Sequence, residues 1–455
     1  MWGSVCGRVP YIFFDSNGRD VWRINIIKVF FIEIMRIKIN YNNLSFWLLF
    51  GALSVSSLNS KAAGLAWVLL TFSGVGLVIK RAFLVESFKR EDASFARTWL
   101  IFTLTALLLK LIPTIYWHDS WAERHAEIRL FAGAIGAYVL FGWRGISMGQ
   151  HRAAAWAVSI TCALALALML FSVREAAPTN PIPWAAAIAL CSAWLLPMAL
   201  TNEAPRWSRW GWAIGSFMGL LAVLISENRG AYGLVLLWPV VLFGHTGIFK
   251  VFNIFKEKLG VRRLVVFVVA AMVSLGLLTQ SSIVQRPLQR IQVAVQEIQL
   301  SHESLDGNVN GSIGARLFMW AHSISFIAQS PWVGHGQQAR KAEIVKWGKE
   351  SHSEHVQSLG HVHNEYLHTL MDYGLWGFAS LLTYMLGMFW MAVRAWSIGL
   401  RSQAWAMGGV LFIHATTGLT NVNFAHNYYP TMLSIVMSLI LITPSIKTLP
   451  ALKIQ

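Results

Sequence analysis

Long apolar stretches recur along most of the chain, and they constrain its fold more than any other feature. About 20 apolar residues are enough for a helix to cross the hydrocarbon core of a bilayer. Here 55% of the residues are apolar and 13% are charged, whereas about 25% are charged in a typical soluble domain. The sequence therefore predicts an all-α polytopic membrane protein with about twelve transmembrane helices, at 44–58, 62–79, 98–117, 128–143, 153–172, 183–200, 208–225, 231–247, 262–280, 370–393, 403–420 and 428–446.

The basic residues between these stretches predict how the chain is oriented. Cytoplasmic connections carry an excess of Lys and Arg. In this chain the basic residues gather in even-numbered connections, as at Lys80, Arg81, Arg144, Arg152, Arg206, Arg209, Lys250, Arg262, Arg263, Arg394 and Arg401. We therefore expect the even-numbered side and both termini to be cytoplasmic. Topology and contacts with lipid headgroups then account for the net charge of +16, which argues against a nucleic-acid partner.

The connections divide the chain into five predicted regions. They are an N-terminal cytoplasmic tail at 1–43, transmembrane helices 1–9 at 44–280, an outward-facing helical loop at 281–369, transmembrane helices 10–12 at 370–446 and a C-terminal cytoplasmic tail at 447–455. Charged residues interrupt each apolar run of the first region, so it does not resemble a cleavable secretory signal. Met35 is an alternative start of the chain.

The outward loop is predicted to contain several short helices. Its first part, 287–300, has the apolar pattern of an amphipathic helix at the membrane surface, with Pro287 in the first turn. A segment rich in Ser, Asn and Gly follows at 301–314 and is typical of a mobile loop. Further helices are expected at 315–328 and 338–357, and the second should present a solvated face with Arg340, Lys341, Lys346 and Lys349.

Two polar groups are predicted to lie on the outward face. One is the turn Glu227-Asn228-Arg229-Gly230 at the end of the seventh stretch, and the other is formed by His361 and His363 just before the tenth. Arg316 begins a helix of the outward loop. Each arginine also has a purely structural interpretation. Arg229 could be an interfacial side chain that reaches lipid phosphates, and Arg316 could be a solvated residue at a helix start.

Four motifs follow one another on this face. They are Arg229-Gly230-Ala231, Arg316 with Trp320, Pro331-Trp332-x-Gly334-x-Gly336, and His361-x-His363-Asn364-x-Tyr366-Leu367 continuing into Asp372-x-Gly374-x-x-Gly377. Together, over residues 229–377, they resemble the O-antigen ligase and O-antigen polymerase superfamily of bacterial inner-membrane proteins. The resemblance implies a GT-C-like glycosyltransferase whose site, and whose outward loop, face the periplasm. Such an enzyme moves a polysaccharide from undecaprenyl diphosphate to the lipid A–core oligosaccharide.

A reaction of this kind needs a base and a cation site. A sugar on a lipid diphosphate already carries a good leaving group, so the enzyme has to accept the proton of the attacking hydroxyl and hold the departing diphosphate. Histidine suits the first task, and we assign it to His363, with His361 second. The planar fork of arginine matches two phosphate oxygens, which assigns Arg229 and Arg316 to the diphosphate. Supporting roles are predicted for Asn364, Tyr366 and Glu227.

The outward segments contain no clustered pair of Asp residues, so the sequence predicts a metal-independent reaction without a cofactor. A single displacement that inverts the anomeric configuration is expected, because no carboxylate pair for a double displacement is evident. The alternative is a zinc site, since His-x-x-His and His-x-His are ligand-like spacings. Its candidate ligands are His352, His355, His361, His363 and His368.

Other functions fit parts of the same sequence. An O-antigen polymerase, or a protein O-oligosaccharyltransferase, would use the same donor and the same Arg and His residues with another acceptor. The ligase is favoured because the outward loop is a single insertion late in the chain. A transporter or flippase of polyprenyl-linked glycans would place ionisable residues deep within its spans and relate its halves by a repeat. Lys110 is one of few such residues, and no internal repeat is evident.

Overall fold

Helices make up the regular structure of the part of the chain that the computed structural model describes, and no strand occurs there. The described residues are 44–82, 93–118, 125–143, 148–171, 177–201, 204–246, 285, 289, 292–299 and 309–441. The first helices are α2 (Leu44–Ser54), α3 (Ser60–Ala82), α4 (Ala93–Tyr116), α5 (His125–Trp143), α6 (Met148–Phe171), α7 (Pro181–Leu200), α8 (Arg206–Ile225), η4 (Arg229–Tyr232) and α9 (Gly233–Thr246). The later ones are α12 (Ser312–Gln329), α13 (Gly336–Glu350), α14 (Glu354–Ser358), α15 (Glu365–Ser397), α16 (Arg401–Gly418), η6 (Asn423–Ala425) and α17 (Tyr428–Leu441).

Several of these helices are suited to cross a membrane. Among the described residues, five are long and apolar enough to do so, namely α4, α6, α7, α8 and α15. Each predicted stretch overlaps a described helix except 262–280, which lies outside the described residues, as do the two predicted tails. The described part of the chain is thus consistent with the predicted all-α, multi-pass membrane protein, while the number of twelve spans stays a prediction.

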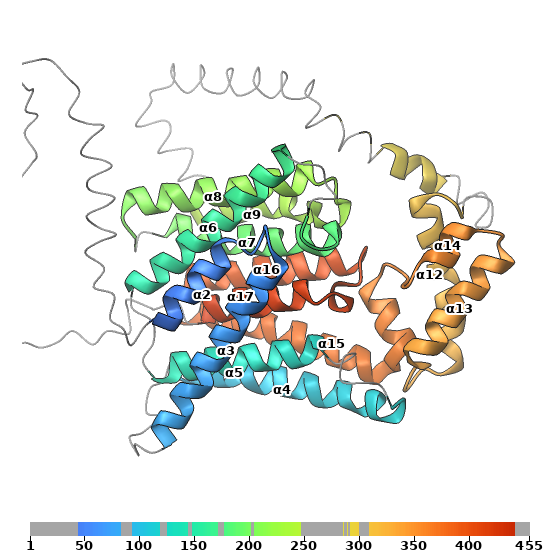
Figure 1. Ribbon diagram of the computed structural model, residues 1–455, viewed down its shortest axis with the longest axis horizontal. Helices are drawn as coiled ribbons and strands as arrows, with labels where there is room; N and C mark the ends of the chain where they lie inside the picture. Colours follow the sequence, from blue (N-terminus) through green and yellow to red (C-terminus); the bar gives the residue numbers. More distant parts are fainter. Residues whose placement is uncertain are drawn as a thin grey trace, which may run out of the picture. The chain divides into compact units, whose positions relative to one another are not determined.

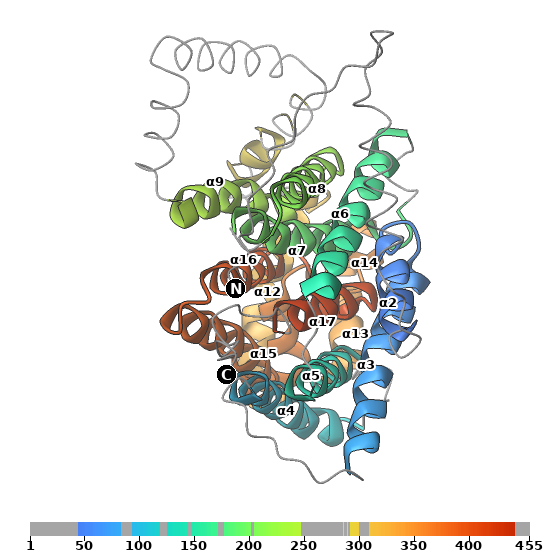
Figure 2. The same ribbon diagram turned by 90° about the vertical axis from the view of Figure 1, so that its left-hand side faces the viewer.

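Helix α7 is enclosed by other helices. It packs against α6, α8, α9, α16 and α17, and Figure 2 shows it among these neighbours. Every side chain from Pro183 to Ala199 is buried. A helix that is apolar around its whole circumference is expected in such a position, and its small residues let neighbouring helices approach closely. On the side of α8, the hydroxyl of Ser192 donates to the carbonyl of Ser216 at 2.8 Å.

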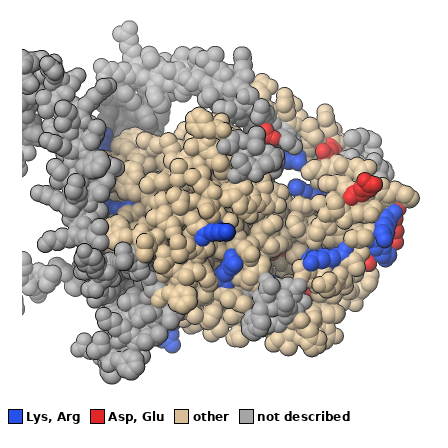
Figure 3. Space-filling view, viewed as in Figure 1, with Lys and Arg blue, Asp and Glu red and all other residues tan. Residues whose placement is uncertain are grey.

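Helices α12, α13 and α14 form a second, smaller core at one end of α15 (Figure 1). Its buried side chains are Val309, Ala315, Phe318, Met319, Phe326, Ile344, Trp347, Val356, Val362 and Met371. Lys, Arg, Asp and Glu side chains gather over these helices, whereas the surface over the other helices shows few in the view of Figure 3. This difference is expected if the smaller core faces water and the larger one faces lipid.

The outward loop differs in detail from its predicted helices. Residues 292–299 are helical, in agreement with the described part of the predicted helix at 287–300. The predicted helix at 338–357 is wrong in its middle, because the chain leaves the helix after Glu350 and starts α14 at Glu354. His352 has a φ of 54°, and the hydroxyl of Ser353 accepts from the amide of Val356 at 3.2 Å. Ser353 therefore caps a new helix.

A kink in α15 receives the turn that precedes α13. Gly374 has a φ of 59° and a ψ of −154° inside α15, a conformation that is open essentially to glycine alone. At the kink, the carbonyl of Pro331 accepts from the amide of Leu375 at 2.8 Å. A side chain at Gly334 would collide with the backbone of Asp372. The glycines of two predicted motifs thus form one tight joint between the turn and α15.

Candidate functional site

The segment between α14 and α15 carries both predicted histidines, and neighbouring helices hold it from several sides. The indole nitrogen of Trp320 on α12 donates to the carbonyl of Val362 at 2.7 Å. Asn364 caps α15, because its side-chain oxygen accepts from the amides of Tyr366 and Leu367, each at 3.0 Å. The hydroxyl of Tyr366 donates to the carbonyl of Ala415 on α16 at 3.0 Å. The histidines are thus held on a braced segment.

The rings of His361 and His363 lie next to each other. Their centroids are 4.3 Å apart and their planes meet at 68°. His363 has a φ of 53°, a left-handed conformation that is uncommon outside glycine and that clusters at functional sites. The buried Nδ1 atom of each ring has no hydrogen-bond partner among the residues that the structure describes. Both rings therefore keep a nitrogen available for another group.

Two further imidazoles surround His361. The centroid of His368, on the first turn of α15, is 6.4 Å from that of His361, and that of His426 is 6.0 Å away. His426 follows η6 and was not among the predicted site residues. The one signal for it in the sequence is its place in the outward connection between the eleventh and twelfth stretches. Its own pKa is lowered by burial and then by the charge of His125.

The predicted arginines come from two other parts of the chain and approach the same place. Arg229 lies in η4, and its Nη2 donates to the hydroxyl of Ser312, the first residue of α12, at 3.5 Å. Arg316 lies one turn further along α12. Burial, and then the charge of Arg229, lower the pKa of Arg316 to about 10. The two guanidinium groups therefore act on one another electrostatically although they lie on separate elements.

Arg316 also acts on the imidazoles. Burial, and then the charges of His361 and Arg316, lower the pKa of His363 to about 2. Burial lowers the pKa of His361 to about 4, with added contributions from His426, Arg340 and Arg316. Both rings are therefore neutral at pH 7. A negative ligand in this cationic surrounding would raise both pKa values again, because it favours the protonated form.

The contacts of Glu227 in the structure leave its predicted supporting role a prediction. Glu227 has a φ of 55°, which turns the chain after α8 and directs the backbone into η4. Glu297, on the helical segment 292–299, is a carboxylate that the sequence analysis did not select. Its Oε2 accepts from the amide of Ile313 at 2.5 Å, and its charge raises the pKa of Arg316.

The predicted solvated face of α13 is wrong at one position. Lys341, Lys346 and Lys349 are exposed, but Arg340 is 2% exposed. Its Nε lies 2.6 Å from Oδ1 of Asp372, and its Nη1 donates to the carbonyl of Gly360. The mixed charges of α13 predicted that Arg340 is exposed to solvent. Its burial against α15 instead depends on the carboxylate of Asp372, which lies 32 residues further along the chain.

The zinc alternative gains no support from the geometry. In the described ranges, no three or more His, Cys, Asp or Glu side chains are arranged to hold a metal ion. His368, one of its candidate ligands, instead directs Nε2 to Oδ2 of Asp372 at 3.3 Å. The metal-independent reaction remains a prediction.

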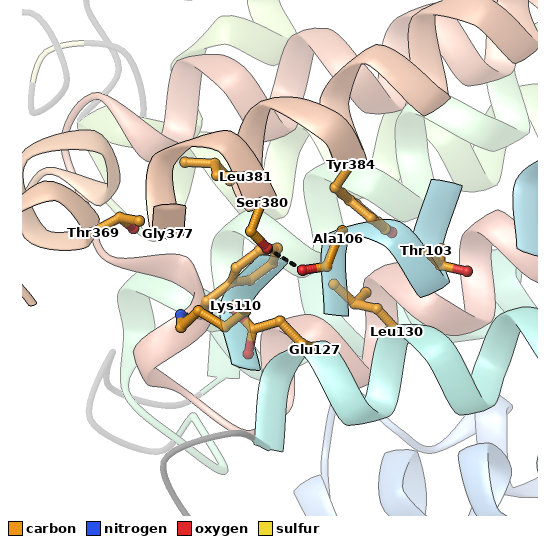
Figure 4. Close-up of a pocket in the computed structure, with 11 residues that line it drawn as sticks. Thr103, Ala106, Lys110, Glu127, Leu130, Thr369, Gly377, Ser380, Leu381 and Tyr384 are labelled. Atoms are coloured by element: carbon orange, nitrogen blue, oxygen red, sulfur yellow. Dashed lines mark hydrogen bonds and ion pairs between the residues drawn. The ribbon is translucent and has the colours of Figure 1, made fainter. Parts of the chain in front are cut away.

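A polar pocket lies between α4, α5 and α15, close to His368 and Asp372. Lys110 pairs with Glu127 there at 3.0 Å (Figure 4). The ammonium group of Lys110 also lies 3.8 Å from the ring centroid of Tyr373. The pocket is lined by Thr103, Ala106, Lys110, Glu127, Leu130, Thr369, Gly377, Ser380, Leu381, Tyr384 and Phe424. Lys110, which the sequence places deep within a span, thus forms an ion pair with Glu127.

Comparison with known proteins supports the family suggested by the motifs. A family model described as O-Antigen ligase matches residues 214–382, a range that contains both arginines and both histidines. The match supports membership of the O-antigen ligase and polymerase superfamily, a glycosyltransferase-like group of membrane proteins. An uncharacterized protein from Haemophilus influenzae is 27% identical over 172 residues, which cover 37% of this chain and 40% of that relative. The match spans less than half the length of that relative.

Proposed function

We propose that this protein is an O-antigen ligase of the bacterial inner membrane. It would transfer a polysaccharide from undecaprenyl diphosphate to a sugar hydroxyl of the lipid A–core oligosaccharide at the periplasmic face. The observation that carries the proposal is the place of Arg316, whose charge acts on His361 and His363. These two rings lie side by side, and Arg316 is itself affected by the charge of Arg229. Its donor and acceptor would be lipid-linked, as befits a site at the end of a membrane helix bundle.

The two arginines would hold the diphosphate of the donor. Guanidinium groups bind phosphate oxygens in pairs, and partial burial strengthens such contacts relative to water. Arg229 and Arg316 repel each other, and the charge of Arg229 is, after burial, the second cause of the lowered pKa of Arg316. A diphosphate between them would remove this repulsion. The two arginines would also stabilise the diphosphate as negative charge develops on the oxygen that leaves the sugar.

His363 would accept the proton of the attacking hydroxyl. In a single displacement, the bond between the acceptor oxygen and the anomeric carbon forms while the bond from that carbon to the phosphate oxygen breaks. The proton passes to the neutral imidazole and the electron pair leaves with the diphosphate. Because the bound diphosphate raises the pKa of His363, the ring becomes a stronger base only once the donor is in place. His361 is the second candidate for this role.

The reaction as proposed is inverting and independent of metal ions. Independence from metal ions is supported by the two guanidinium groups, which supply the positive charge that a divalent cation would otherwise supply. A purified-protein assay with lipid-linked donor and a chelator checks this point. Full turnover with the chelator is expected, and loss of turnover that zinc restores would revive the zinc alternative.

The polymerase and the protein O-oligosaccharyltransferase remain the alternatives, because they would use the same donor site. The transporter alternative rests on Lys110, which lies in a buried pair with Glu127, and such a pair is compatible with either function. Assays with three acceptors separate the remaining functions. The proposal expects product only with lipid A–core, and not with a second lipid-linked glycan or with a protein hydroxyl.

Complementation of a strain that lacks surface-polysaccharide ligation tests the assignment in cells. We expect His363→Ala, Arg229→Ala and Arg316→Ala to abolish polymer-capped lipid A–core at equal membrane abundance. Lys346→Ala is the matched control, because this side chain is exposed on the same outward loop and pairs with Glu343 nearby, at 3.1 Å. Capping by all three site variants at the level of the control would overturn the proposed function.

A further inference from the structure

Arg340 is a buried cation that contacts the segment carrying His361 and His363. Its side chain and that of Asp372 are each 2% exposed, and the two are joined by a 2.6 Å contact. A second nitrogen of the same guanidinium donates to the carbonyl of Gly360, the residue just before His361. One planar group therefore ties α13, α15 and the segment 360–363 together.

Asp372 extends this contact to the other side of the imidazole pair. Its Oδ1 faces Arg340, and its Oδ2 lies 3.3 Å from Nε2 of His368. The ring of His368 in turn lies 6.4 Å, centroid to centroid, from that of His361. Arg340 is thus connected to His361 twice, through the backbone at Gly360 and through Asp372 and His368.

The segment needs such a brace because its conformation is strained. His363 adopts a φ of 53°, which persists in a folded protein only where the surroundings over-determine it. Trp320 holds the carbonyl of Val362 from α12, and Asn364 fixes the start of α15. Arg340 donates to the carbonyl of Gly360 and so fixes the beginning of the segment.

We propose that Arg340 is a positioning residue for the transfer reaction, whose fork at Gly360 and Asp372 aims the imidazoles of His361 and His363 at the donor. The inference rests on the proposed function. It assigns Arg340 no contact with the substrate. Its loss should therefore lower the rate of the chemical step and leave donor binding to Arg229 and Arg316, since a displacement of about 1 Å can reduce a rate about 10²-fold.

A series at position 340 separates charge from geometry. Arg340→Lys keeps the charge but cannot reach Asp372 and Gly360 at once, because an ammonium group is a compact point charge. Arg340→Gln loses the charge as well. In a purified-protein ligation assay we expect kcat to fall about 10²-fold in Arg340→Gln and less in Arg340→Lys. KM for the lipid-linked donor should stay within about twofold of wild type, which corresponds to a small change in binding free energy.

A double variant covers the possibility that Arg340→Gln fails to fold with an uncompensated buried carboxylate. Arg340→Met combined with Asp372→Asn removes both charges, and neutral replacement of a buried ion pair commonly preserves stability. The double variant should regain wild-type melting temperature and membrane abundance but keep the low kcat, because nothing then holds the carbonyl of Gly360. Lys346→Gln, which removes the exposed ion pair of the same helix, is the control and should match wild type in both measurements.

The outcomes separate this inference from the proposed function. Ligation by wild type together with full kcat in the stable double variant would show that the pair only stabilises the fold, and would overturn the inference. A raised donor KM at unchanged kcat would also overturn it, because Arg340 would then act on binding. Absence of ligation by wild type with every acceptor would instead overturn the proposed function.

Discussion

The helix bundle around α7 and the smaller core of α12–α14 are stabilised in different ways. In the bundle, burial is continuous and apolar, as in α7, where all side chains from Pro183 to Ala199 are inside. In the smaller core, single polar contacts such as Arg340 with Asp372 and Trp320 with Val362 determine where the segment 360–363 lies. One region thus supplies a continuous apolar frame, and the other supplies single contacts that determine the position of one segment. Substitutions in the two regions should therefore affect stability and activity differently.

The largest effect is expected on turnover, from loss of the proposed general base next to the smaller core. His363→Ala should reduce turnover about 10²–10⁴-fold, the range for loss of a general base, with little change in melting temperature. Turnover of purified protein with lipid-linked donor and lipid A–core measures it. A His363→Ala enzyme within threefold of wild type would show that another group takes the proton, and His361→Ala should then be the inactive variant.

The next largest effect belongs to the bundle. Trp184 on α7 is fully buried, and its indole nitrogen donates to the carbonyl of Ser57 at 2.9 Å. Trp184→Ala should lower the free energy of unfolding by about 3–5 kcal/mol, the usual cost of removing a buried aromatic side chain. Thermal unfolding in detergent measures the change. The remaining folded protein should keep the donor KM of wild type, and a selective change of KM would contradict a purely structural role for α7.

The joint between the regions should respond at an intermediate level. Gly374→Ala places a side chain at a φ of 59° and against the backbone of Trp332. We expect a loss of about 1–3 kcal/mol from the backbone conformation alone and a disturbance of the nearby Arg340–Asp372 contact. Gly64→Ala is the matched control, because a side chain there meets nothing within 4 Å. Equal melting temperatures for the two variants would show that the joint is not strained.

A smaller effect, taken per pH unit, is expected for acidification. Burial lowers the pKa of His361 to about 4, from 6.5, so the unfolded chain binds more protons than the folded one between these values. Stability should be complete above pH 6.5 and be lost as pH falls toward 4, by at most about 1.4 kcal/mol per pH unit for one such group. Melting temperature against pH measures this loss. The slope should be shallower in His361→Asn, and an unchanged slope would indicate that other groups cause it.

The smallest effect is expected for the exposed ion pair of Lys346 with Glu343, in which Lys346 is 59% exposed. Lys346→Gln should change stability by no more than about 0.5 kcal/mol, because exposed pairs are screened by water and salt. The melting temperature of this variant beside that of Arg340→Gln compares two ion pairs on one helix. Similar losses from both would contradict the distinction between them.

Hydropathy was sufficient to predict the bundle, since a bilayer demands long apolar helices and the described helices overlap the predicted stretches. Sidedness and motifs were enough to select Arg229, Arg316, His361 and His363 as candidates for one site. The contacts that complete this region did not follow. Arg340 resembled a solvated residue because helix α13 is polar, and His426 belongs to a connection without a motif. Both positions depend on packing between segments far apart in the chain, which no local pattern encodes.

Donor binding tests the central claim most directly, namely that two guanidinium groups hold a lipid diphosphate beside an imidazole. The measurement is the affinity of purified protein for undecaprenyl diphosphate, in wild type, Arg316→Ala and His363→Ala. We predict that Arg316→Ala weakens binding at least tenfold, about 1.4 kcal/mol, while His363→Ala binds like wild type. Unchanged affinity in Arg316→Ala together with Arg229→Ala would contradict the account.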